Sequence, residues 1–377
     1  MSVEMIEIGK CCEVIAGQSP PSSTYNQNGD GMPFFQGKAD FGELYPTVRY
    51  WCDNPKKISQ PNDILFSLRA PVGPTNINRI QACIGRGLAA IRCKDVDTMY
   101  LLHFLRGNEN KIASLGTGST FKAIRVGVLK ELKIPLPPLE TQKKIASILD
   151  AADAYRQKTK ALIQKYDELT QSLFLEMFGD PVTNPKGWEK VKFSEVGKLD
   201  RGKSKHRPRN APELLGGDHP LIQTGDLANC GVYLTKYKST YSDIGLKQSK
   251  KWPKGTLCIT IAANIAKTGI LDFDACFPDS IVGFVPNEKS NNVYVLYWMS
   301  FLQKIIEDSA PESAQKNINL AILRDLDFLA APIDLQNQFA ERIQEIEKQK
   351  AQVQESLKKA EELFSSLLQR VFKGELV

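Results

Sequence analysis

An internal repeat constrains the fold of this chain more than any other feature. Residues 100–178 and 294–372 match without a gap at a constant offset of 194 positions. Identical residues along the repeat include Tyr100 and Tyr294, Lys122 and Lys316, Gln142 and Gln336, and Phe178 and Phe372. Identities held in register over this length indicate a duplication, in which each half is a globular segment followed by a long helix. Two similar halves predict two similar surfaces about an approximate two-fold axis, which suits a target with two separated parts.

The globular segments have the pattern of short strands bounded by turn residues. In the first, residues 61–63 form a turn before the apolar run 64–68, and in the second residues 253–256 precede the run 257–261. A short helix is expected in each, at 99–106 and 294–303. We therefore predict an α+β fold with two similar, mostly-β domains. The predicted boundaries are domain 1 at 1–139, a first long helix at 140–180, domain 2 at 181–333 and a second long helix at 334–377.

Two long helices should follow the two domains. The first begins after Pro138 and ends at Gly179, where glycine and proline stop it, and about 39 residues give a length of roughly 58 Å. Apolar residues recur at three- and four-residue steps, which predicts a two-stranded coiled coil between the repeats. Antiparallel pairing follows from the two-fold relation, and the pair would act as a stiff spacer; the alternative is that each helix lies on its own domain. The predicted pairing residues are Ile145, Ile148, Tyr155, Leu162, Leu169 and Leu173 in the first helix, and Ile343, Ile346, Val353, Leu357, Phe364 and Leu367 in the second.

The positive charge of the chain is confined to the globular segments. Residues 1–139 hold 16 Lys and Arg against 12 Asp and Glu, and residues 181–333 hold 20 against 16, whereas both helical segments are slightly acidic. A polyanion would therefore meet the globular parts. No stretch is apolar for the length of a bilayer. Eight cysteines without a paired C-x-x-C arrangement, beside only three histidines, indicate free thiols in the cytoplasm and no zinc site.

A basic stretch in the second segment is the strongest candidate for DNA contact. Residues 198–209 are rich in lysine and arginine and poor in apolar residues, and prolines follow at 208 and 212. This composition predicts an exposed loop that is either merely solvated or in contact with DNA phosphates and bases. Arg69 and Arg86 could instead form internal ion pairs, and Lys122 and Lys316 could cap helices or form salt bridges. The candidate DNA-binding residues are Arg69, Arg79, Arg86, Lys122, Lys203, Lys205, Arg207, Arg209, Lys250, Lys251 and Lys316.

Residues 197–204 match the phosphate-binding pattern G-x-x-x-x-G-K-S. Such a loop needs a helix after it, and the prolines at 208 and 212 forbid one. We therefore do not expect a nucleotide site here. Since no nucleophile, paired acids or cofactor loop stands out either, we expect no catalytic residues, no cofactor and no metal in this chain.

The helix boundaries resemble a known family. Residues 134–142, Ile-Pro-Leu-Pro-Pro-Leu-Glu-Thr-Gln, lead into a long helix that ends Glu-Met-Phe-Gly-Asp-Pro at 176–181. This arrangement resembles the central region of the specificity subunits of type I restriction–modification enzymes, and residues 331–336, Ala-Pro-Ile-Asp-Leu-Gln, resemble their distal region.

The resemblance implies two target recognition domains that read the two parts of a split double-stranded DNA site, with the helices setting the spacer. It also implies two methyltransferase subunits that use S-adenosylmethionine to methylate adenine, and two restriction subunits, using ATP and Mg²⁺, that can join for cleavage. All cofactors would then belong to partner subunits. The competing hypothesis is a coiled-coil adaptor whose globular heads bind protein.

Overall fold

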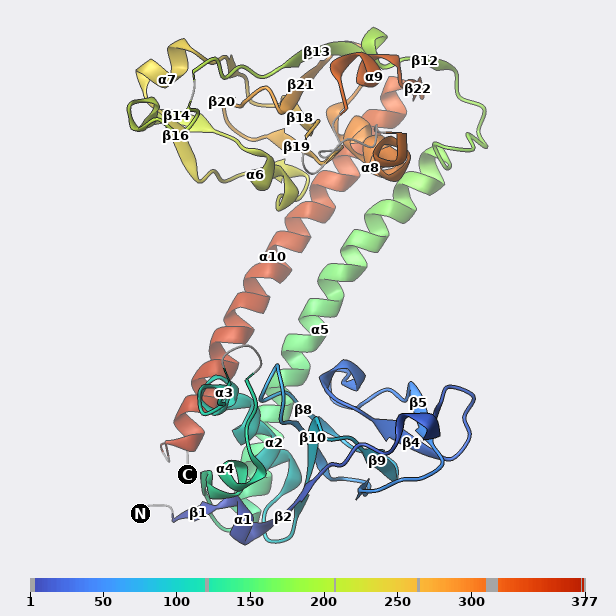
Figure 1. Ribbon diagram of the computed structural model, residues 1–377. Coiled ribbons are helices and arrows are strands. Elements are labelled where there is room, and N and C mark those ends of the chain that lie inside the picture. The colour runs from blue at the N-terminus through green and yellow to red at the C-terminus, as the bar shows by residue number, and fades with distance from the viewer. Residues whose placement is uncertain are drawn as a thin grey trace. The chain divides into compact units, whose positions relative to one another are not determined.

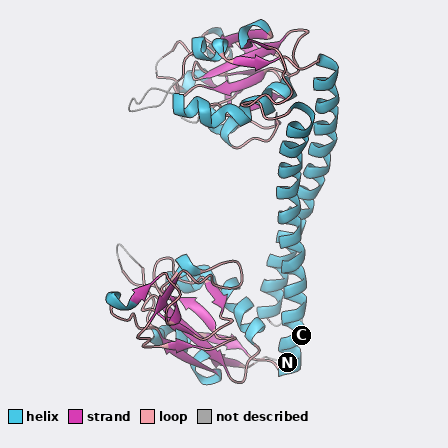
Figure 2. Ribbon diagram, turned by 90° about the vertical axis from the view of Figure 1, so that its right-hand side faces the viewer, coloured by secondary structure: helices cyan, strands magenta, loops and turns pink. Residues whose placement is uncertain are grey.

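The computed structural model describes residues 4–118, 122–206, 208–262, 265–309, 318–373 and 375. It divides into two compact units: unit 1 is Met1–Lys160 with Glu355–Val377, and unit 2 is Ala161–Gln354. Each unit contains a strand-rich head together with parts of the two long helices α5 (Leu139–Phe178) and α10 (Ile333–Phe372). Figure 2 shows the strands gathered in the heads and absent from the long helices. The predicted α+β fold is confirmed.

The head of unit 1 is built on two main sheets. The antiparallel four-stranded sheet has the order β2-β10-β7-β8, and the five-stranded sheet has the order β3-β5-β4-β9-β6. The two strands β1 and β11 form a separate ladder that joins the chain start to the residues before α5. The strands are β1 (Met5–Glu7), β2 (Cys12–Ala16), β3 (Tyr25–Asn26), β4 (Met32–Phe35), β5 (Tyr50–Cys52), β6 (Ile58–Ser59), β7 (Ile64–Ser67), β8 (Thr75–Ile77), β9 (Ala82–Ile84), β10 (Leu88–Cys93) and β11 (Lys133–Pro135).

The head of unit 2 repeats this topology with different lengths. Its five-stranded sheet has the order β13-β21-β18-β19-β15, its four-stranded sheet β16-β14-β20-β17, and β12 pairs with β22. In both heads a parallel pair interrupts the antiparallel pattern at the matching place, β4 with β9 and β14 with β20, and unit 2 has a second parallel pair, β15 with β19. The strands are β12 (Lys190–Lys192), β13 (Gly197–Arg201), β14 (Leu215–Leu221), β15 (Tyr233–Leu234), β16 (Ser239–Tyr241), β17 (Lys251–Trp252), β18 (Leu257–Thr260), β19 (Thr268–Leu271), β20 (Ala275–Cys276), β21 (Ile281–Pro286) and β22 (Asp327–Leu329).

Short helices complete each head. In unit 1 they are α1 (Ile8–Cys11), α2 (Thr98–Gly107), α3 (Glu109–Ser114) and α4 (Val126–Glu131), and in unit 2 they are α6 (Thr224–Ala228), α7 (Asp243–Lys247), α8 (Asn292–Ser309) and α9 (Leu320–Asp325). The expected short helices are therefore present as α2 and α8. Among the described residues, no helix has both the length and the apolar character that crossing a bilayer requires. All eight cysteines are free, as predicted.

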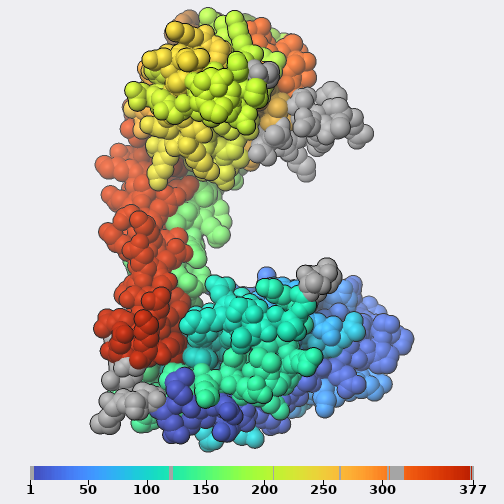
Figure 3. Space-filling model, turned by 60° about the vertical axis from the view of Figure 1, so that its left-hand side comes forward, coloured from blue at the N-terminus to red at the C-terminus, as the bar shows by residue number. Residues whose placement is uncertain are grey.

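The same aromatic contact joins head and helices in both units. In unit 1, Tyr100 on α2 lies 5.3 Å from Phe372 near the end of α10, measured between ring centroids. In unit 2 the repeat-equivalent Tyr294 lies 4.6 Å from Phe178 at the end of α5. Each head therefore holds the start of the helix that follows it and the end of the other helix. Figure 3 shows the last turns of α10 against the unit 1 head, and Figure 1 labels the elements that meet there.

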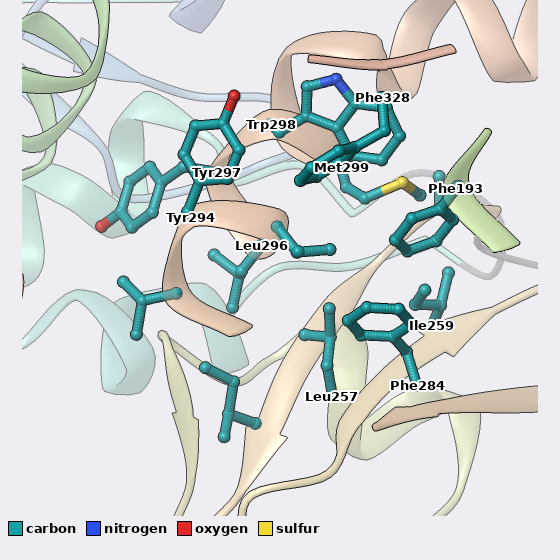
Figure 4. Close-up of a cluster of buried hydrophobic side chains, with 14 of the residues drawn as sticks. Phe193, Leu257, Ile259, Phe284, Tyr294, Leu296, Tyr297, Trp298, Met299 and Phe328 are labelled. Carbon is teal, nitrogen blue, oxygen red and sulfur yellow. The ribbon is translucent and has the colours of Figure 1, made fainter. Parts of the chain in front are cut away.

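A large aromatic core fixes the junction in unit 2. Figure 4 shows Phe193 and Phe284 beside Trp298 and Phe328, and the rings of Phe193 and Phe284 stack with centroids 4.6 Å apart. These side chains come from the segment after β12, from β21, from α8 and from β22. Burying aromatic side chains dominates the packing energy of a core, so the sheet, α8 and the strand that leads into α10 should fold together.

The two long helices pair within each unit, running antiparallel. In unit 1, Lys160 lies 3.2 Å from Glu361, and the guanidinium of Arg156 sits 4.5 Å above the ring of Phe364. In unit 2, Tyr166 hydrogen-bonds to Gln349, and Lys350 pairs with Asp167. Residue numbers rise on α5 as they fall on α10, which is the predicted direction. The alternative, that each helix lies on its own domain alone, is therefore wrong.

The predicted pairing face is correct for α10 but shifted on α5. All six α10 residues, Ile343, Ile346, Val353, Leu357, Phe364 and Leu367, are buried or half-buried. On α5, Ile145 is buried and Leu173 half-buried. By contrast Ile148, Tyr155, Leu162 and Leu169 are 53%, 55%, 41% and 48% exposed. The prediction is wrong for these four, because the inward heptad lies one residue later, at Leu149, Arg156, Ile163 and Thr170.

Candidate nucleic-acid interface

Each head has a turn held against the segment that connects its two main sheets, between β9 and β10 in unit 1 and between β20 and β21 in unit 2. In unit 1 the amides of Gly17 and Gln18 donate to the carbonyls of Leu88 and Ile84, both at 2.9 Å. The glycine is required by this close approach, because a Cβ at Gly17 would lie 2.2 Å from the Gly85 carbonyl oxygen. Backbone hydrogen bonds therefore hold the turn in place, and the side chains on the turn extend from a fixed backbone.

Unit 2 has the same turn. The amides of Gly202 and Lys203 donate to the carbonyls of Ile281 at 2.9 Å and Phe277 at 3.1 Å, and a Cβ at Gly202 would lie 2.3 Å from the Phe277 carbonyl oxygen. This geometry also contradicts a phosphate-binding loop at 197–204. Residues 197–201 form strand β13, and the two amides that follow are already paired within the protein.

A second fixed point is the turn after β4 and after β14. In unit 1 the Asp40 carboxylate accepts from the amides of Gln36 at 2.6 Å and Gly37 at 3.2 Å, and Arg49 donates to the same carboxylate. Asp40 is only 2% exposed. In unit 2, Asp226 accepts from the amide of Gln223 at 2.9 Å. Both heads thus present an exposed glutamine on a backbone held by an aspartate.

Between these two turns lies a surface hollow in each head. Hollow 1, in unit 1, has a volume of about 610 Å³. Its polar lining includes Ser19, Tyr25, Gln36, Lys38, Arg69 and Arg86. Hollow 1 is therefore basic, and among the described residues neither Arg69 nor Arg86 forms an ion pair. The alternative prediction of internal ion pairs for these two arginines is wrong.

Hollow 2, in unit 2, occupies the equivalent place and has a volume of about 260 Å³. Its polar lining includes Ser204, Arg209, Asn210, Gln223, Tyr241 and Ser280. Arg86 lies two residues after Ile84, and the equivalent residue in unit 2, two residues after Phe277, is Asp279. The carboxylate of Asp279 pairs with Arg209. The Asp279 carbonyl also accepts two hydrogen bonds from Arg201. Arginine and aspartate therefore neutralise each other beside hollow 2.

Of the other predicted DNA contacts in unit 1, Lys122 lies close to hollow 1 and Arg79 lies apart from it. Lys122 is exposed and adjoins Ala123, which forms a β-bridge with Arg69. Arg79 is also exposed, but its guanidinium lies 3.3 Å above the ring of Tyr45, which does not line hollow 1. The structure thus brings Arg69, Arg86 and Lys122 to one region and gives Arg79 an aromatic partner instead.

In unit 2 the prediction of a loop over 198–209 is wrong for residues 198–201, which form part of strand β13 paired with β21. The lysines that follow the strand are exposed but partly held. Lys203 and Lys205 are exposed, and the Lys205 amide donates to the Gln248 side chain at 2.6 Å. Lys250 lies 3.5 Å above the Trp252 ring and 3.6 Å from Asp200, while Lys251 is exposed on β17. The candidates Arg207 and Lys316 lie outside the described residues.

Sequence reasoning missed some of the residues that line the hollows. Tyr25 and Lys38 gave no signal, because nothing in their neighbours indicates that two distant turns meet. Gln36 and Gln223 did have a signal in the sequence, because each is the last residue of a Pro-x-x-Gln pattern that both heads share. Both heads therefore carry a glutamine on matching exposed turns, and this match was visible in the sequence.

The geometry of two repeated heads agrees with comparisons to known proteins. The family model described as type I restriction modification DNA specificity domain matches residues 2–171 and again 185–362. The EcoBI type I restriction enzyme specificity subunit of Escherichia coli is 21% identical over 98% of this chain and 85% of that protein. A Methanocaldococcus jannaschii protein assigned as the MjaX specificity subunit is 45% identical over 179 residues.

Coverage differs among these relatives. The chain spans 42% of the MjaX protein and 51% of the MjaIX specificity subunit from the same organism. The crystal structure of a type I restriction–modification S subunit from M. genitalium has a TM-score of 0.64 at 15% identity, covering 98% of this chain and 96% of that one, which supports the fold. Since the family model covers both repeats, the chain belongs to the family of type I restriction–modification DNA specificity domains and contains two of them.

Proposed function

We propose that this chain is the non-catalytic specificity subunit of a type I restriction–modification system, in which the two heads recognise the two parts of a split double-stranded DNA site. One observation carries the proposal: the family model matches each of the two repeats, and the two repeats have the same backbone framework. The two heads share the turns around their hollows and differ in the side chains that line them. Shared framework with different linings is what two readers of different sequences need.

The catalytic work would then belong to partner subunits. We place adenine methylation, with S-adenosylmethionine, in two methyltransferase subunits, and cleavage, with ATP and Mg²⁺, in restriction subunits that join them. The paired helices α5 and α10 would set the length of the unread spacer in the DNA site. Free cysteines and a DNA target both suit a cytoplasmic location.

A methyltransferase subunit is the occupant that we assign to the exposed stripe of α5. Ile148, Tyr155, Leu162 and Leu169 recur every seventh residue and are each at least 41% exposed. A row of large apolar side chains left in water on one helix is typical of a surface that a partner covers. Leu162→Lys with Leu169→Lys should prevent co-purification of the methyltransferase, while Gln164→Lys, at an exposed polar position, should not.

DNA binding is tested on the basic loop. Reversing the charge at Lys203, Lys205, Arg207 and Arg209 in the complex with the methyltransferase should weaken binding of the split site and make its salt dependence shallower, since each phosphate contact releases counterions. Binding titrations at several salt concentrations measure both quantities. Unchanged affinity would remove this loop from the interface. Binding of protein partners that persists at high salt, with no affinity for DNA, would instead favour the adaptor hypothesis.

A further inference from the structure

We propose that hollow 1 is a base-reading site in which Arg86 takes the major-groove edge of a guanine, with Arg69 beside it, and that hollow 2 reads a different base pair. The inference rests on the proposed DNA-specificity function and assigns to one head the chemical group that it recognises. Four observations carry it: a fixed framework, two arginines without acidic partners, a recess large enough for a base edge, and a different charge pattern at the matching place in unit 2.

The framework holds Arg86 by its backbone rather than by its side chain. The Arg86 amide donates to the Ser19 hydroxyl at 3.1 Å, and the Leu88 amide donates to the Gly85 carbonyl at 3.0 Å. Arg69 is likewise fixed at its backbone, by the bridge to Ala123. Both side chains thus extend from anchored positions, and their guanidinium groups remain available for a ligand. A preorganised backbone lowers the cost of ordering a long side chain on binding.

The chemistry of hollow 1 favours guanine. A guanidinium group donates two parallel hydrogen bonds to O6 and N7 of guanine, the commonest specific contact between arginine and a base. Among the described residues, Arg69 and Arg86 have no carboxylate partner that this contact would have to displace. Gln36 and Lys38, both exposed residues whose side chains can donate, lie in the same lining. Donors therefore dominate hollow 1, and guanine offers two acceptors.

Hollow 2 differs from hollow 1 in the charge of the residue equivalent to Arg86. The residue at the position of Arg86 is Asp279, which already pairs with Arg209. That pair satisfies the arginine, and it places a carboxylate, which accepts rather than donates, beside the hollow. The volume of about 260 Å³ is also less than half of that of hollow 1, about 610 Å³. The two heads should therefore not prefer the same base at the matching position of their half-sites.

A phosphate contact is the competing role for the same arginines, and it makes a different prediction. An arginine on a phosphate strengthens binding to every sequence alike, whereas an arginine on a base strengthens binding to one base at one position. Arg86→Ala and Arg86→Lys separate the two. Lysine keeps the charge but lacks the planar fork, so it should retain a phosphate contact and lose much of the guanine preference.

The experiment uses the full chain in complex with its methyltransferase. Binding to a library of split sites and sequencing of methylated adenines in cells give the preferred base at every position. We expect both Arg86 variants to lose guanine preference by about 5- to 150-fold at one position in one half-site, with the other half-site unchanged. Lys94→Ala is the charge control, because Lys94 is exposed at the opposite end of β10.

The outcomes separate this inference from the function on which it rests. If the wild-type complex methylates a split site and the Arg86 variants keep its full base preference, hollow 1 does not read a base. Uniform weakening at all sites in Arg86→Ala, with binding retained in Arg86→Lys, identifies a phosphate contact and also overturns the inference. If the wild-type complex has no sequence preference, the proposed function itself fails.

Discussion

Two buried glutamines hold the starts of the long helices to the heads. The Gln142 side chain accepts from the Asp97 amide and donates to the Pro137 carbonyl, both at 2.8 Å. Gln336, at the matching repeat position, accepts from the Asn291 amide at 2.9 Å and donates to the Ala331 carbonyl at 2.7 Å. Both glutamines are at most 1% exposed. Each therefore satisfies two backbone groups at the junction of a head with its long helix.

Replacing Gln336 by leucine should lower the free energy of unfolding by about 1–3 kcal/mol, because the half-buried Asn291 amide loses its acceptor and the buried Ala331 carbonyl loses its donor. Urea denaturation of the isolated chain measures the loss. Gln338→Leu is the matched control, because Gln338 is exposed two residues further along α10. Equal losses in the two variants would mean that the hydrogen bonds of Gln336 do not stabilise the junction.

Glu347, on α10 within unit 2, gives the chain a pH-dependent element. Burial raises the pKa of Glu347 above its ordinary value of 4.5, Asp167 raises it further, and Lys350 opposes the shift. The ionised carboxylate is thus less favourable in the folded chain than in the unfolded chain. This residue therefore contributes most to stability below pH 4.5, and that contribution is lost as the pH rises through the raised pKa.

Glu347→Gln should consequently be more stable than the wild type at pH 7 and should lose this advantage near pH 4. Thermal melting at both pH values measures the difference in Tm. Glu345→Gln, at an exposed position on the same helix, should leave that pH dependence unchanged. A variant less stable than the wild type at pH 7 would mean that the ion pair with Lys350, at 3.8 Å, outweighs burial.

Single residues also mark what the sequence could not predict about the candidate site. Exposure of the basic loop followed from its prolines and charges, and that prediction is confirmed for Lys203 and Lys205. The pairing of Arg209 with Asp279 joins residues 70 positions apart, and no local pattern indicates such a contact. The same holds for the meeting of Arg69 and Arg86, which depends on how β7 and β10 are placed in one sheet.

At the scale of elements, the register of α5 is the clearest difference between sequence and structure. The heptad of large apolar residues lies outward, while the inward heptad includes the polar residues Arg156 and Thr170. Arg156 pairs with Asp153 and lies over Phe364, and the Thr170 hydroxyl bonds to the Asp167 carbonyl. Polar residues tolerate burial when their groups are paired. Counting apolar residues alone therefore selects the outward face, because it cannot see these partners.

Two substitutions on α5 test the register directly. Leu149→Ala removes a side chain with no exposed surface and should lower the free energy of unfolding by about 2–5 kcal/mol. Leu169→Lys, at a position that the coiled-coil pattern places inside, should change it by less than about 0.5 kcal/mol. Urea denaturation of the isolated chain compares them. A large loss in Leu169→Lys would restore the predicted register and contradict the structure.

At the scale of the whole molecule, the repeat was the most informative part of the sequence. It predicted two α+β heads, two long helices of about 40 residues and antiparallel pairing of those helices, and these features are present. The two repeats form equivalent hydrogen bonds. The Tyr100 hydroxyl donates to the Pro135 carbonyl at 2.7 Å, and the Tyr294 hydroxyl donates to the Leu329 carbonyl at 2.8 Å. Such bonds explain why the two repeats still align without a gap. Buried contacts restrict change, whereas the exposed linings of hollows 1 and 2 were free to diverge.

The central claim is that two similar heads read the two parts of one split DNA site. Sequencing of methylated adenines in DNA from cells that carry the chain with its methyltransferase, compared with cells that lack the chain, tests it most directly. The account predicts a methylated motif of two short specified segments separated by a fixed number of unspecified bases, which disappears without the chain. A single uninterrupted motif, or a methylation pattern that does not depend on the chain, would contradict it.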